Sequence, residues 1–449
     1  MTASKSKKNK YEIDMCNGTV LDKLISFSIP LMLSSILQLL FNAVDIVVVG
    51  RFSGSRALAA VGSTTALINV FTNLFIGVSL GANVLAARFY ATKQEKQMSE
   101  TVHTAVTFAL ISGIVMVFVG LFFSKAALLL MDTPSDVIGQ SALYMRIYFA
   151  GMPFFMLYNY GAAILRAVGD TKRPLFFLII AGIVNAALNL FLVIVLHLGV
   201  AGVAIATVIA QMISCLLVLR CLYRSDGSYQ LRFSAMTIKW IYLKQIFQVG
   251  IPAGIQSTVI NFSNVLLQSS VNSFGSIAMA GYTAANNIFG FLYAAANSIT
   301  QACMSFTSQN YGAGKWKRMD KVLRNCILLS VVVSLILGGG SYLFGPELLK
   351  IYTSDPKVIQ CGMEILLYTT VTYFMCGLMD LFPGALRGMG YSAIPMLLSI
   401  IGTVGTRIVW IFRSLDVLFI SYPASWLITI ILQVICYFFV RKRIHNPLP

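Results

Sequence analysis

Charged residues are scarce in this chain: 11% of its 449 residues are Asp, Glu, Lys or Arg, whereas 57% are hydrophobic. Soluble domains carry about 25% charged residues, so this scarcity excludes a soluble globular protein. The apolar residues form repeated runs of about 20 residues, the length at which a helix crosses roughly 30 Å of hydrocarbon. The sequence therefore predicts an all-α polytopic membrane protein.

Histidine is also scarce, and the chain contains only His103, His197 and His445. No cluster of histidines or carboxylates and no nucleophile beside a base stands out, which disfavours an integral-membrane enzyme. An ATP-driven pump needs G-x-x-x-x-G-K-[ST], and "YGAGKWKR" at Tyr311 lacks the first Gly and the Ser or Thr after Lys. The eight cysteines form no C-x-x-C pair and are interpreted as small hydrophobes. We therefore expect no enzyme activity, no cofactor and no firm metal site.

Basic residues outnumber acidic ones by 33 to 16, which gives a net charge of +17. They cluster at every second gap between apolar runs, and the intervening gaps hold few, such as Arg51 and Lys125. This alternation is the positive-inside pattern and predicts an even number of spans with both termini in the cytoplasm. A nucleic-acid groove would not alternate with spans, so we expect no nucleic-acid partner. The basic clusters are Lys5–Lys23, Arg88–Lys96, Arg166–Arg173, Arg220–Lys244, Lys315–Arg324, Arg387 and Arg441–Arg443.

Division of the apolar runs at charges, Gly and Pro predicts twelve transmembrane helices in two six-helix bundles. The expected domains are an N-terminal bundle over residues 1–224, a cytoplasmic connector over 225–245 and a C-terminal bundle over 246–449. The predicted spans lie near residues 24–50, 57–87, 101–124, 137–160, 174–196, 200–223, 246–273, 278–309, 323–345, 358–383, 392–412 and 418–440.

The second half of the chain repeats the first at an offset of about 221 residues. Because each half has six spans, both halves enter the membrane from the same side. We expect the two bundles to be related by a pseudo-twofold axis along the membrane normal, with substrate held between them. The "SIP" at Ser28 matches "GIP" at Gly250, one residue off this register. The offset superposes Gly54 on Gly275, Tyr90 on Tyr311, Val137 on Val358, Leu165 on Leu386, Gly169 on Gly390 and Pro174 on Pro395.

The first span contains one carboxylate, Asp45, inside the apolar segment "LLFNAVDIVVVG". An ionisable group within a span costs about 2.5–3.5 kcal/mol on insertion scales, so it usually faces a cavity and has a function. The alternative is a carboxylate that is merely satisfied by helix packing. The repeat places Leu266 at the matching position, so the scaffold can be built without the acid.

The fifth and sixth spans add polar side chains that could join Asp45. Asn185 and Asn189 are one turn apart and therefore share a helix face, and Thr207 lies in the sixth span. If these four residues converge, they form a cation-coupling site for H⁺ or Na⁺, with Na⁺ held by Asp45, Asn185 and Thr207. Oxygen ligands suit hard cations, and amides suit a carboxylate that changes its protonation state.

Further residues are candidates for a hinge and a substrate cleft. Pro30 removes a helix hydrogen bond in the first span, and it either breaks the helix near its inner end or acts as a hinge that responds to Asp45. For Asp380 in the tenth span, pairing with Arg387 and contact with substrate are both open. For Arg407 in the eleventh span, a buried partner and an outer-mouth position both fit. The expected cleft residues are Gln38, Phe41, Asn42, Asn159, Gln256 and Asp380.

Several motifs resemble the multidrug and toxic compound extrusion family, MATE, and the resemblance covers nearly the whole chain. It implies two six-helix bundles that form a V-shaped cleft, and export of organic cations and other amphipaths driven by inward flow of H⁺ or Na⁺. The motifs are "FNAVDIVVVG" with Asp45, "RAVGDTKRP" from Arg166, "NAALN" from Asn185, "GVAGVAIAT" from Gly199 and "ALRGMG" from Ala385.

Within that family the chain looks most like the DinF-like branch, in which a first-helix carboxylate matching Asp45 is assigned to cation coupling. Asn185 and Thr207 match its fifth- and sixth-helix partners. Asn189 departs from the pattern, because several relatives have Asp there, and one carboxylate in place of two favours H⁺ over Na⁺. The NorM-like branch carries a seventh-helix Glu, whereas "IPAGIQSTVINF" contains no acid.

The sequence therefore predicts a cation-coupled antiporter, with H⁺ favoured and Na⁺ as the alternative, that exports amphipathic drugs from the cytoplasm by alternating access. We expect a monomer in the plasma membrane, the inner membrane of a bacterium, that contributes to antibiotic resistance. Its expected partners are small amphipathic or cationic substrates and the lipid bilayer. A lipid-linked oligosaccharide or other lipid flippase of the same superfamily is the alternative, and an integral-membrane enzyme is disfavoured.

Overall fold

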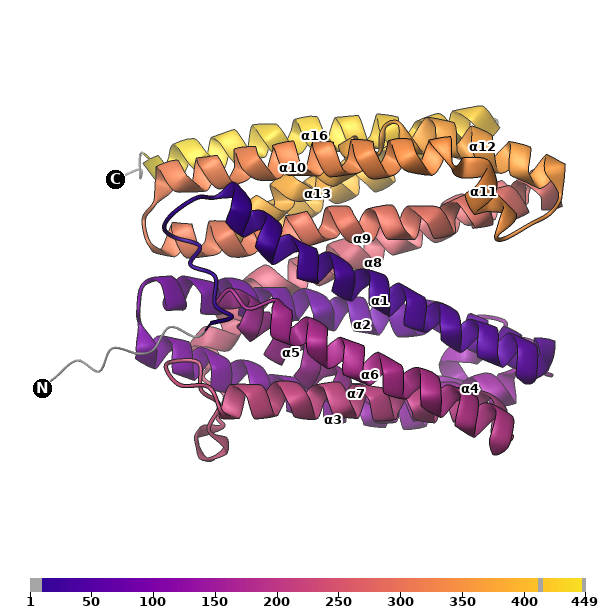
Figure 1. The fold of residues 1–449 in the computed structure, drawn as a ribbon, viewed down its shortest axis with the longest axis horizontal. Helices are drawn as coiled ribbons and strands as arrows, with labels where there is room; N and C mark the ends of the chain where they lie inside the picture. Colours follow the sequence, from indigo (N-terminus) through magenta and orange to yellow (C-terminus); the bar gives the residue numbers. More distant parts are fainter. Residues whose placement is uncertain (1–9, 411–414, 446–449) are drawn as a thin grey trace, which may run out of the picture. The chain divides into compact units, whose positions relative to one another are not determined.

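The computed structural model describes residues 10–410 and 415–445. Over these ranges the chain forms helices and turns and contains no strand, which confirms the predicted all-helical class (Figure 1). The helices up to the connector are α1 (Leu21–Phe52), α2 (Gly54–Ala91), α3 (Glu95–Leu130), α4 (Ile138–Ala150), α5 (Met152–Ala167), α6 (Lys172–Leu190), the π-helix η1 (Phe191–Val195), α7 (Gly199–Tyr223) and the 3₁₀ turn η2 (Phe233–Ala235). Those after it are α8 (Trp240–Asn272), α9 (Ser276–Gly312), α10 (Trp316–Leu343), α11 (Gly345–Lys350), α12 (Pro356–Thr370), α13 (Tyr373–Gly388), α14 (Ala393–Ser399), the π-helix η3 (Ile400–Gly405), α15 (Thr406–Trp410) and α16 (Leu415–His445).

Each predicted span falls on one helix or on an interrupted run of helices. The fourth span is α4 and α5, which meet at Gly151, and the tenth is α12 and α13, which are bent by 45°. The eleventh is α14, η3 and α15, and its predicted end at residues 411 and 412 lies outside the described residues. By length and composition alone, seven described helices are able to cross a membrane, or eight when α12 and α13 count as one span.

By its internal contacts the chain divides into two compact units. Unit 1 consists of Met1–Asp14 and Leu33–Ile251, and unit 2 consists of Met15–Met32 and Pro252–Pro449. The first helix of each half is therefore divided between the units. The division in α1 comes two residues after Pro30, and the division in α8 comes directly before Pro252. These two prolines belong to the matched "SIP" and "GIP" segments. The predicted domains, residues 1–224 and 246–449, each contained their first predicted helix whole, whereas the units divide both helices.

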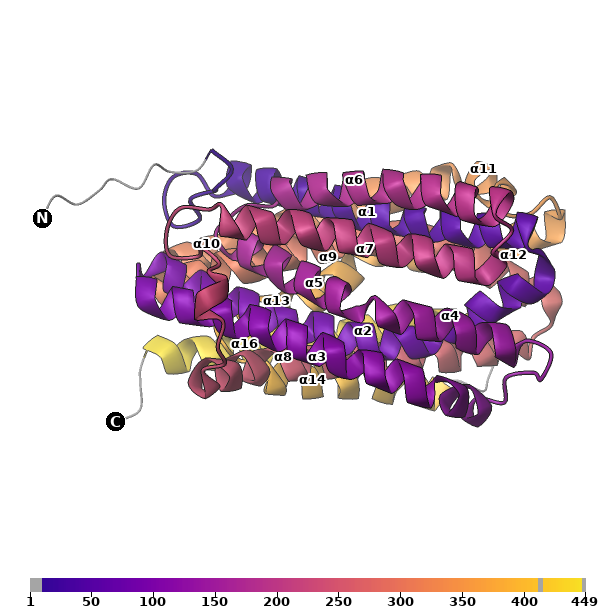
Figure 2. The same ribbon diagram turned by 90° about the horizontal axis from the view of Figure 1, so that it is seen from below.

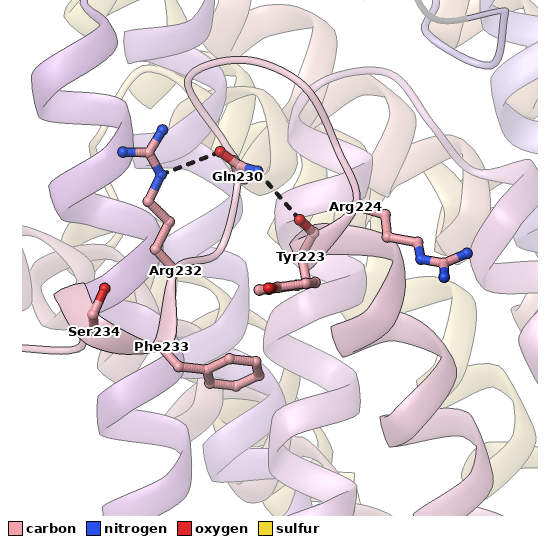
Figure 3. A pocket seen from close by; sticks show the side chains of 6 residues that line it. All are labelled: Tyr223, Arg224, Gln230, Arg232, Phe233 and Ser234. Carbon is pink, nitrogen blue, oxygen red and sulfur yellow. Dashed lines mark hydrogen bonds between the residues drawn. The ribbon is translucent and has the colours of Figure 1, made fainter.

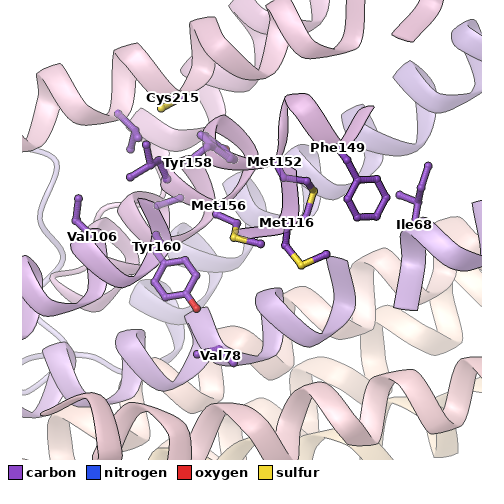
Figure 4. Close-up of a cluster of buried hydrophobic side chains, with 14 of the residues drawn as sticks. Ile68, Val78, Val106, Met116, Phe149, Met152, Met156, Tyr158, Tyr160 and Cys215 are labelled. Carbon is purple, nitrogen blue, oxygen red and sulfur yellow. The ribbon is translucent and has the colours of Figure 1, made fainter. Parts of the chain in front are cut away.

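Unit 1 has an apolar core in which methionine is prominent. Met116 of α3 and Met152 and Met156 of α5 are buried beside Phe149 of α4 (Figure 4). Phe149 also meets Phe71 of α2 edge to face, with ring centroids 5.6 Å apart. Unbranched methionine side chains fill the irregular spaces between packed helices. This core holds α2, α3, α4 and α5 together, and α7 packs against it through α5 and α4.

Unit 2 has cores of its own. One contains the buried side chains of Leu366, Phe419 and Tyr282, and a second surrounds Tyr373 and Trp426, whose ring centroids lie 5.9 Å apart. Each unit thus has its own apolar interior.

The repeat register pairs glycines that have the same backbone conformation. Gly54 and Gly275 have φ angles of 84° and 99°, and Gly169 and Gly390 have φ angles of 97° and 92°. These values lie in the left-handed region, where a side chain is strained and glycine is not. At Gly169 a Cβ would also lie only 2.5 Å from the carbonyl oxygen of Ile13. The two halves therefore share their turns between helices as well as their helix order.

Candidate functional site

The carboxylate of Asp45 lies inside unit 1, on the part of α1 that faces α6 and α7. Its residue is 8% exposed. Asn189 Nδ2 of α6 donates a hydrogen bond to Asp45 Oδ1, and Thr207 Oγ1 of α7 donates to Asp45 Oδ2 at 3.3 Å. The carboxylate is thus held by neutral side chains from two neighbouring helices, which run side by side (Figure 2).

A fourth side chain closes this network. Asn189 Nδ2 also lies 3.2 Å from Asn185 Oδ1 and donates to it, as the one-turn spacing on α6 predicts. Asn185 Nδ2 in turn donates to Thr207 Oγ1 at 3.5 Å. The structure therefore brings together the four residues that the sequence proposes for cation coupling, on α1, α6 and α7.

A contact between an α1 side chain and the α6 backbone lies beside the network. Gly182 of α6 lies against the ring of Phe41 of α1, so closely that a Cβ at Gly182 would overlap the ring. Gly182 precedes Asn185 by three residues and Phe41 precedes Asp45 by four, so this contact lies about one turn from the network on both helices. The π-helix η1 begins two residues after Asn189, and such wide turns often occur at functional sites.

The partners of Asp45 leave one oxygen unused. Asn189 Oδ1 is buried and has no hydrogen-bond partner, a situation that costs about 1–3 kcal/mol. A proton on Asp45 or a small bound cation would give this oxygen a partner. Among the described residues no group of three or more His, Cys, Asp or Glu could hold a metal ion. Any cation at this site would therefore depend on one carboxylate and neutral oxygens.

Two tyrosines near Asp45 were not among the candidates from the sequence. Tyr144 and Tyr148 of α4 stack with ring centroids 6.2 Å apart, and both interact electrostatically with Asp45. Their spacing of four residues places them on one helix face, which is the only signal that the sequence gives. Nothing local indicates that this face points toward α1.

The expected cleft residues of unit 1 differ in their surroundings. Gln38 and Asn42 are exposed on α1. Phe41 is half-buried against Gly182. Asn159 of α5 donates to the carbonyl of Phe155 at 2.8 Å, within its own helix. Gln38 and Asn42 are therefore the exposed members of this set, and their contact with substrate stays a prediction.

The remaining expected cleft residues lie in unit 2. Gln256 of α8 is buried and accepts a hydrogen bond of 2.6 Å from Arg387 Nη2 of α13. Asp380, also on α13, interacts with the charge of Arg387 and with the hydroxyl of Tyr293 of α9. Pairing of Asp380 with Arg387 and contact of Asp380 with substrate both stay predictions.

Arg407 is buried in unit 2, at 3% exposure. Its Nη1 donates to Asn264 Oδ1 at 2.9 Å and its Nε to Ser425 Oγ at 3.3 Å. The guanidinium also lies over the ring of Tyr422, 4.6 Å from its centroid. Of the two alternatives for Arg407, the structure shows buried partners.

Pro30 lies within α1, which continues as a helix on both sides of it. The helix passes from unit 2 to unit 1 two residues later. Its role as a hinge stays a prediction.

Comparison with known proteins identifies the family. The MatE family model matches residues 30–191 and 252–412, once in each half of the chain. The chain is 29% identical over 433 residues to the "Probable multidrug resistance protein YoeA" of Bacillus subtilis (strain 168), with 93% of each chain covered. It is 24% identical over 418 residues to the "Probable multidrug resistance protein NorM" of Thermotoga maritima, with 90% of this chain and 88% of the relative covered.

A solved structure has the same fold. It is described as "Outward-facing conformation of a multidrug resistance MATE family transporter of the MOP superfamily", and it matches with a TM-score of 0.89 at 19% identity. The match covers 98% of this chain and 99% of that one. At this identity the likeness concerns the fold, and it confirms the predicted polytopic helical class. The two matches cover more than half of the chain and include four of the five motifs singled out above, all except "GVAGVAIAT", so the chain belongs to the MatE family.

Proposed function

We propose that this protein is an antiporter that exports small amphipathic molecules, organic cations among them, and that H⁺ bound at Asp45 drives the export. The observation that carries the proposal is the buried Asp45, which is hydrogen-bonded to two neutral side chains, those of Asn189 and Thr207. Membership of the MatE family supports a multi-pass location in the plasma membrane. The relatives named as multidrug resistance proteins support small molecules as substrates and disfavour an enzyme.

The network suits both protonation states of the carboxyl group. A charged Asp45 accepts from Asn189 and Thr207, as the structure has it. A protonated Asp45 becomes a donor and needs an acceptor, which the unused Asn189 Oδ1 provides once the amide rotates. Binding of a proton therefore changes the hydrogen bonds between α1 and α6 and gives Asn189 Oδ1 the partner that it lacks when Asp45 is charged.

This exchange gives a coupling mechanism. Asp45 is charged while substrate is held from the cytoplasm. A proton from outside neutralises it and weakens the polar links of α1 to α6 and α7, because hydrogen bonds to a charged group are about twice as strong as those to a neutral one. The part of α1 beyond Pro30 then changes its packing in unit 1 and substrate is released. Loss of the proton to the cytoplasm restores the first state.

Sodium is the second candidate ion, and one observation favours it. The unused Asn189 Oδ1 is a neutral oxygen of the kind that coordinates a hard cation. H⁺ is preferred here because Asp45 is the only negatively charged member of the network, so a bound Na⁺ would have a single carboxylate as its counter-charge. The two ions make different predictions for imposed gradients.

The test is accumulation of a fluorescent organic cation, ethidium, in proteoliposomes with H⁺ and Na⁺ gradients imposed separately. A gradient of about one pH unit is worth roughly 1.4 kcal/mol, so exchange of one proton for one monovalent cation supports about tenfold accumulation. Exchange for a neutral substrate also uses the membrane potential, which adds roughly 2.3 kcal/mol per 100 mV. We expect the pH gradient to drive transport by wild type and not by Asp45→Asn.

A matched control separates this role from a general effect of lost charge. Asp136→Asn removes an exposed carboxylate of unit 1 that lies outside the network, and it should transport like wild type. If only the Na⁺ gradient drives ethidium accumulation, the coupling ion is Na⁺ and the proposal of H⁺ is wrong. Unchanged pH-driven transport by Asp45→Asn would exclude Asp45 as the coupling residue.

A further inference from the structure

The end of α7, the connector after it and the start of α8 carry a group of basic residues. Between Arg220 and Lys244 the sequence contains five basic residues and one acidic residue, Asp226. All of it belongs to unit 1. Clusters of this density directly beside a membrane-spanning helix are typical of contacts with anionic lipid headgroups. The five basic residues, all exposed, are Arg220, Arg224, Arg232, Lys239 and Lys244.

The segment is fixed to the body of unit 1 by its backbone. The amide of Arg232 donates to His103 Nε2 at 3.0 Å, and the amide of Lys239 donates to Thr104 Oγ1 at 3.1 Å. His103 and Thr104, both on α3, are buried. The amide of Leu231 donates to the carbonyl of Leu222, the last but one residue of α7, at 3.1 Å. The side chains of this segment therefore project from a defined backbone.

An open hollow of about 600 Å³ lies on this segment. Figure 3 shows Tyr223 beside Phe233, with the guanidinium groups of Arg224 and Arg232 extending to opposite sides of that pair. The two rings are stacked, with centroids 5.7 Å apart. Gln230 joins the sides of the hollow, because its Oε1 accepts from Arg232 Nε at 3.2 Å and its Nε2 donates to the carbonyl of Tyr223 at 3.3 Å.

Large apolar side chains at the same place are exposed. Tyr223 and Phe233 are 53% and 56% exposed, and Trp240 and Ile241 at the start of α8 are 68% and 63% exposed. Aromatic side chains with basic neighbours are enriched where a membrane meets water, because the rings lie at the headgroup level and the cations reach the phosphates. A soluble anion such as free phosphate would need the guanidinium groups but would leave these rings in water.

We propose that this surface, formed by Tyr223, Arg224, Gln230, Arg232, Phe233 and Ser234, binds the phosphate headgroups of anionic phospholipids at the membrane surface. The two guanidinium groups each bind a headgroup phosphate, and Tyr223 and Phe233 lie between the headgroups. This lipid site goes beyond the proposed transport function and does not depend on the role of Asp45.

Native mass spectrometry of the detergent-solubilised full chain tests the proposal with phosphatidylglycerol and phosphatidylcholine of the same acyl chains. A basic residue near an anionic surface is worth about fivefold in binding, so Arg224→Gln/Arg232→Gln should weaken phosphatidylglycerol binding by on the order of twentyfold. Arg224→Lys/Arg232→Lys keeps both charges and should keep most of the affinity. The matched control is Arg51→Gln/Arg56→Gln. It removes two exposed basic residues where α1 ends and α2 begins, and it should bind phosphatidylglycerol like wild type.

Two further measurements on wild type complete the test, and they need no variant to fold. The preference for phosphatidylglycerol should fall in 0.5 M NaCl, because salt screens exposed charges. Inorganic phosphate at 10 mM should not displace the lipid. Equal loss in the control variant, or a preference that salt leaves unchanged, would overturn the site. Complete displacement of phosphatidylglycerol by inorganic phosphate would show that the surface binds free anions and would overturn the proposal that it binds lipid.

Discussion

The two halves of this protein place buried polar networks of opposite charge within two residues of matching positions in the repeat. In unit 1, Asp45 of α1 accepts hydrogen bonds from α6 and α7. In unit 2 the position of Asp45 is occupied by Leu266, and two residues before it Asn264 accepts a hydrogen bond from Arg407. Arg407 in turn lies one residue after Thr406, the repeat counterpart of Asn185. The same region of the scaffold thus holds an acid in one half and a cation in the other.

The difference teaches which half can respond to a proton gradient. A guanidinium keeps its charge under all working conditions and only donates hydrogen bonds, whereas a carboxyl group changes from acceptor to donor when it binds a proton. The Arg407 network is therefore static with respect to pH, and the Asp45 network is not. Under the proposed function, this comparison assigns ion coupling to unit 1 and assigns a stabilising role in unit 2 to the Arg407 network.

The strongest way to break the comparison is to remove the titratable group of unit 1. In Asp45→Asn, accumulation driven by about one pH unit should fall from about tenfold to none, because no carboxyl group remains to exchange a proton. Equilibrium exchange of labelled substrate without a gradient measures whether the variant still binds. Exchange that persists while accumulation is lost is the expected pattern.

Removing the amide that donates to Asp45 should shift the pH dependence rather than abolish transport. Asn189→Ala deletes a hydrogen bond to a charged group, worth about 1.5–3 kcal/mol, so the charged form of Asp45 is disfavoured. The pH of half-maximal transport should move upward by about 1–2 units. Thr207→Val is the comparison: its hydroxyl also bonds to the carbonyl of Val203 at 3.0 Å, so a smaller upward shift is expected. A downward shift in either variant would contradict this arrangement of donors.

The matching change in unit 2 should affect stability and leave coupling intact. Arg407→Met deprives Asn264 and Ser425 of a buried donor, which costs about 1–3 kcal/mol. We expect a lower midpoint of thermal unfolding in detergent, together with pH-driven accumulation at the wild-type ratio for the folded fraction. Loss of pH-driven accumulation in a folded Arg407→Met protein would show that the Arg407 network also takes part in coupling.

The smallest expected effect concerns the contact that positions Asp45. Gly182→Ala pushes the Phe41 ring aside and should destabilise the protein by about 1 kcal/mol, at the lower end for overpacking, since the ring can shift. Gly139→Ala is the control, because a Cβ there meets no atom within 4 Å. Thermal unfolding of both variants, with the pH dependence of transport, measures the effect. Equal behaviour of the two variants would mean that the contact between Phe41 and Gly182 is not needed to position Asp45.

The helical class, the repeat and the members of the Asp45 network were within reach of the sequence. The spacing of Asn185 and Asn189 fixes their common face on any α-helix, and a lone Asp45 in an apolar run must find polar partners. The matched glycines at positions 54 and 275 show the same conformation in the two halves because only glycine tolerates it without strain.

Other contacts between helices distant in the sequence were out of reach. Asn264 and Arg407 lie on α8 and α15, and no periodicity in either segment indicates that they meet. The stacking of Tyr144 and Tyr148 follows from their spacing, but the helix that their face meets does not. The "SIP" and "GIP" match likewise does not reveal that the two units divide next to Pro30 and Pro252, because that division depends on tertiary packing.

The most direct test of the central claim is proton release on substrate binding, measured with a pH indicator in weakly buffered detergent solution. The account predicts that ethidium releases protons from wild type and from Asp380→Asn, and none from Asp45→Asn. Proton release from Asp45→Asn equal to that of wild type would show that another group exchanges the proton and would contradict the account.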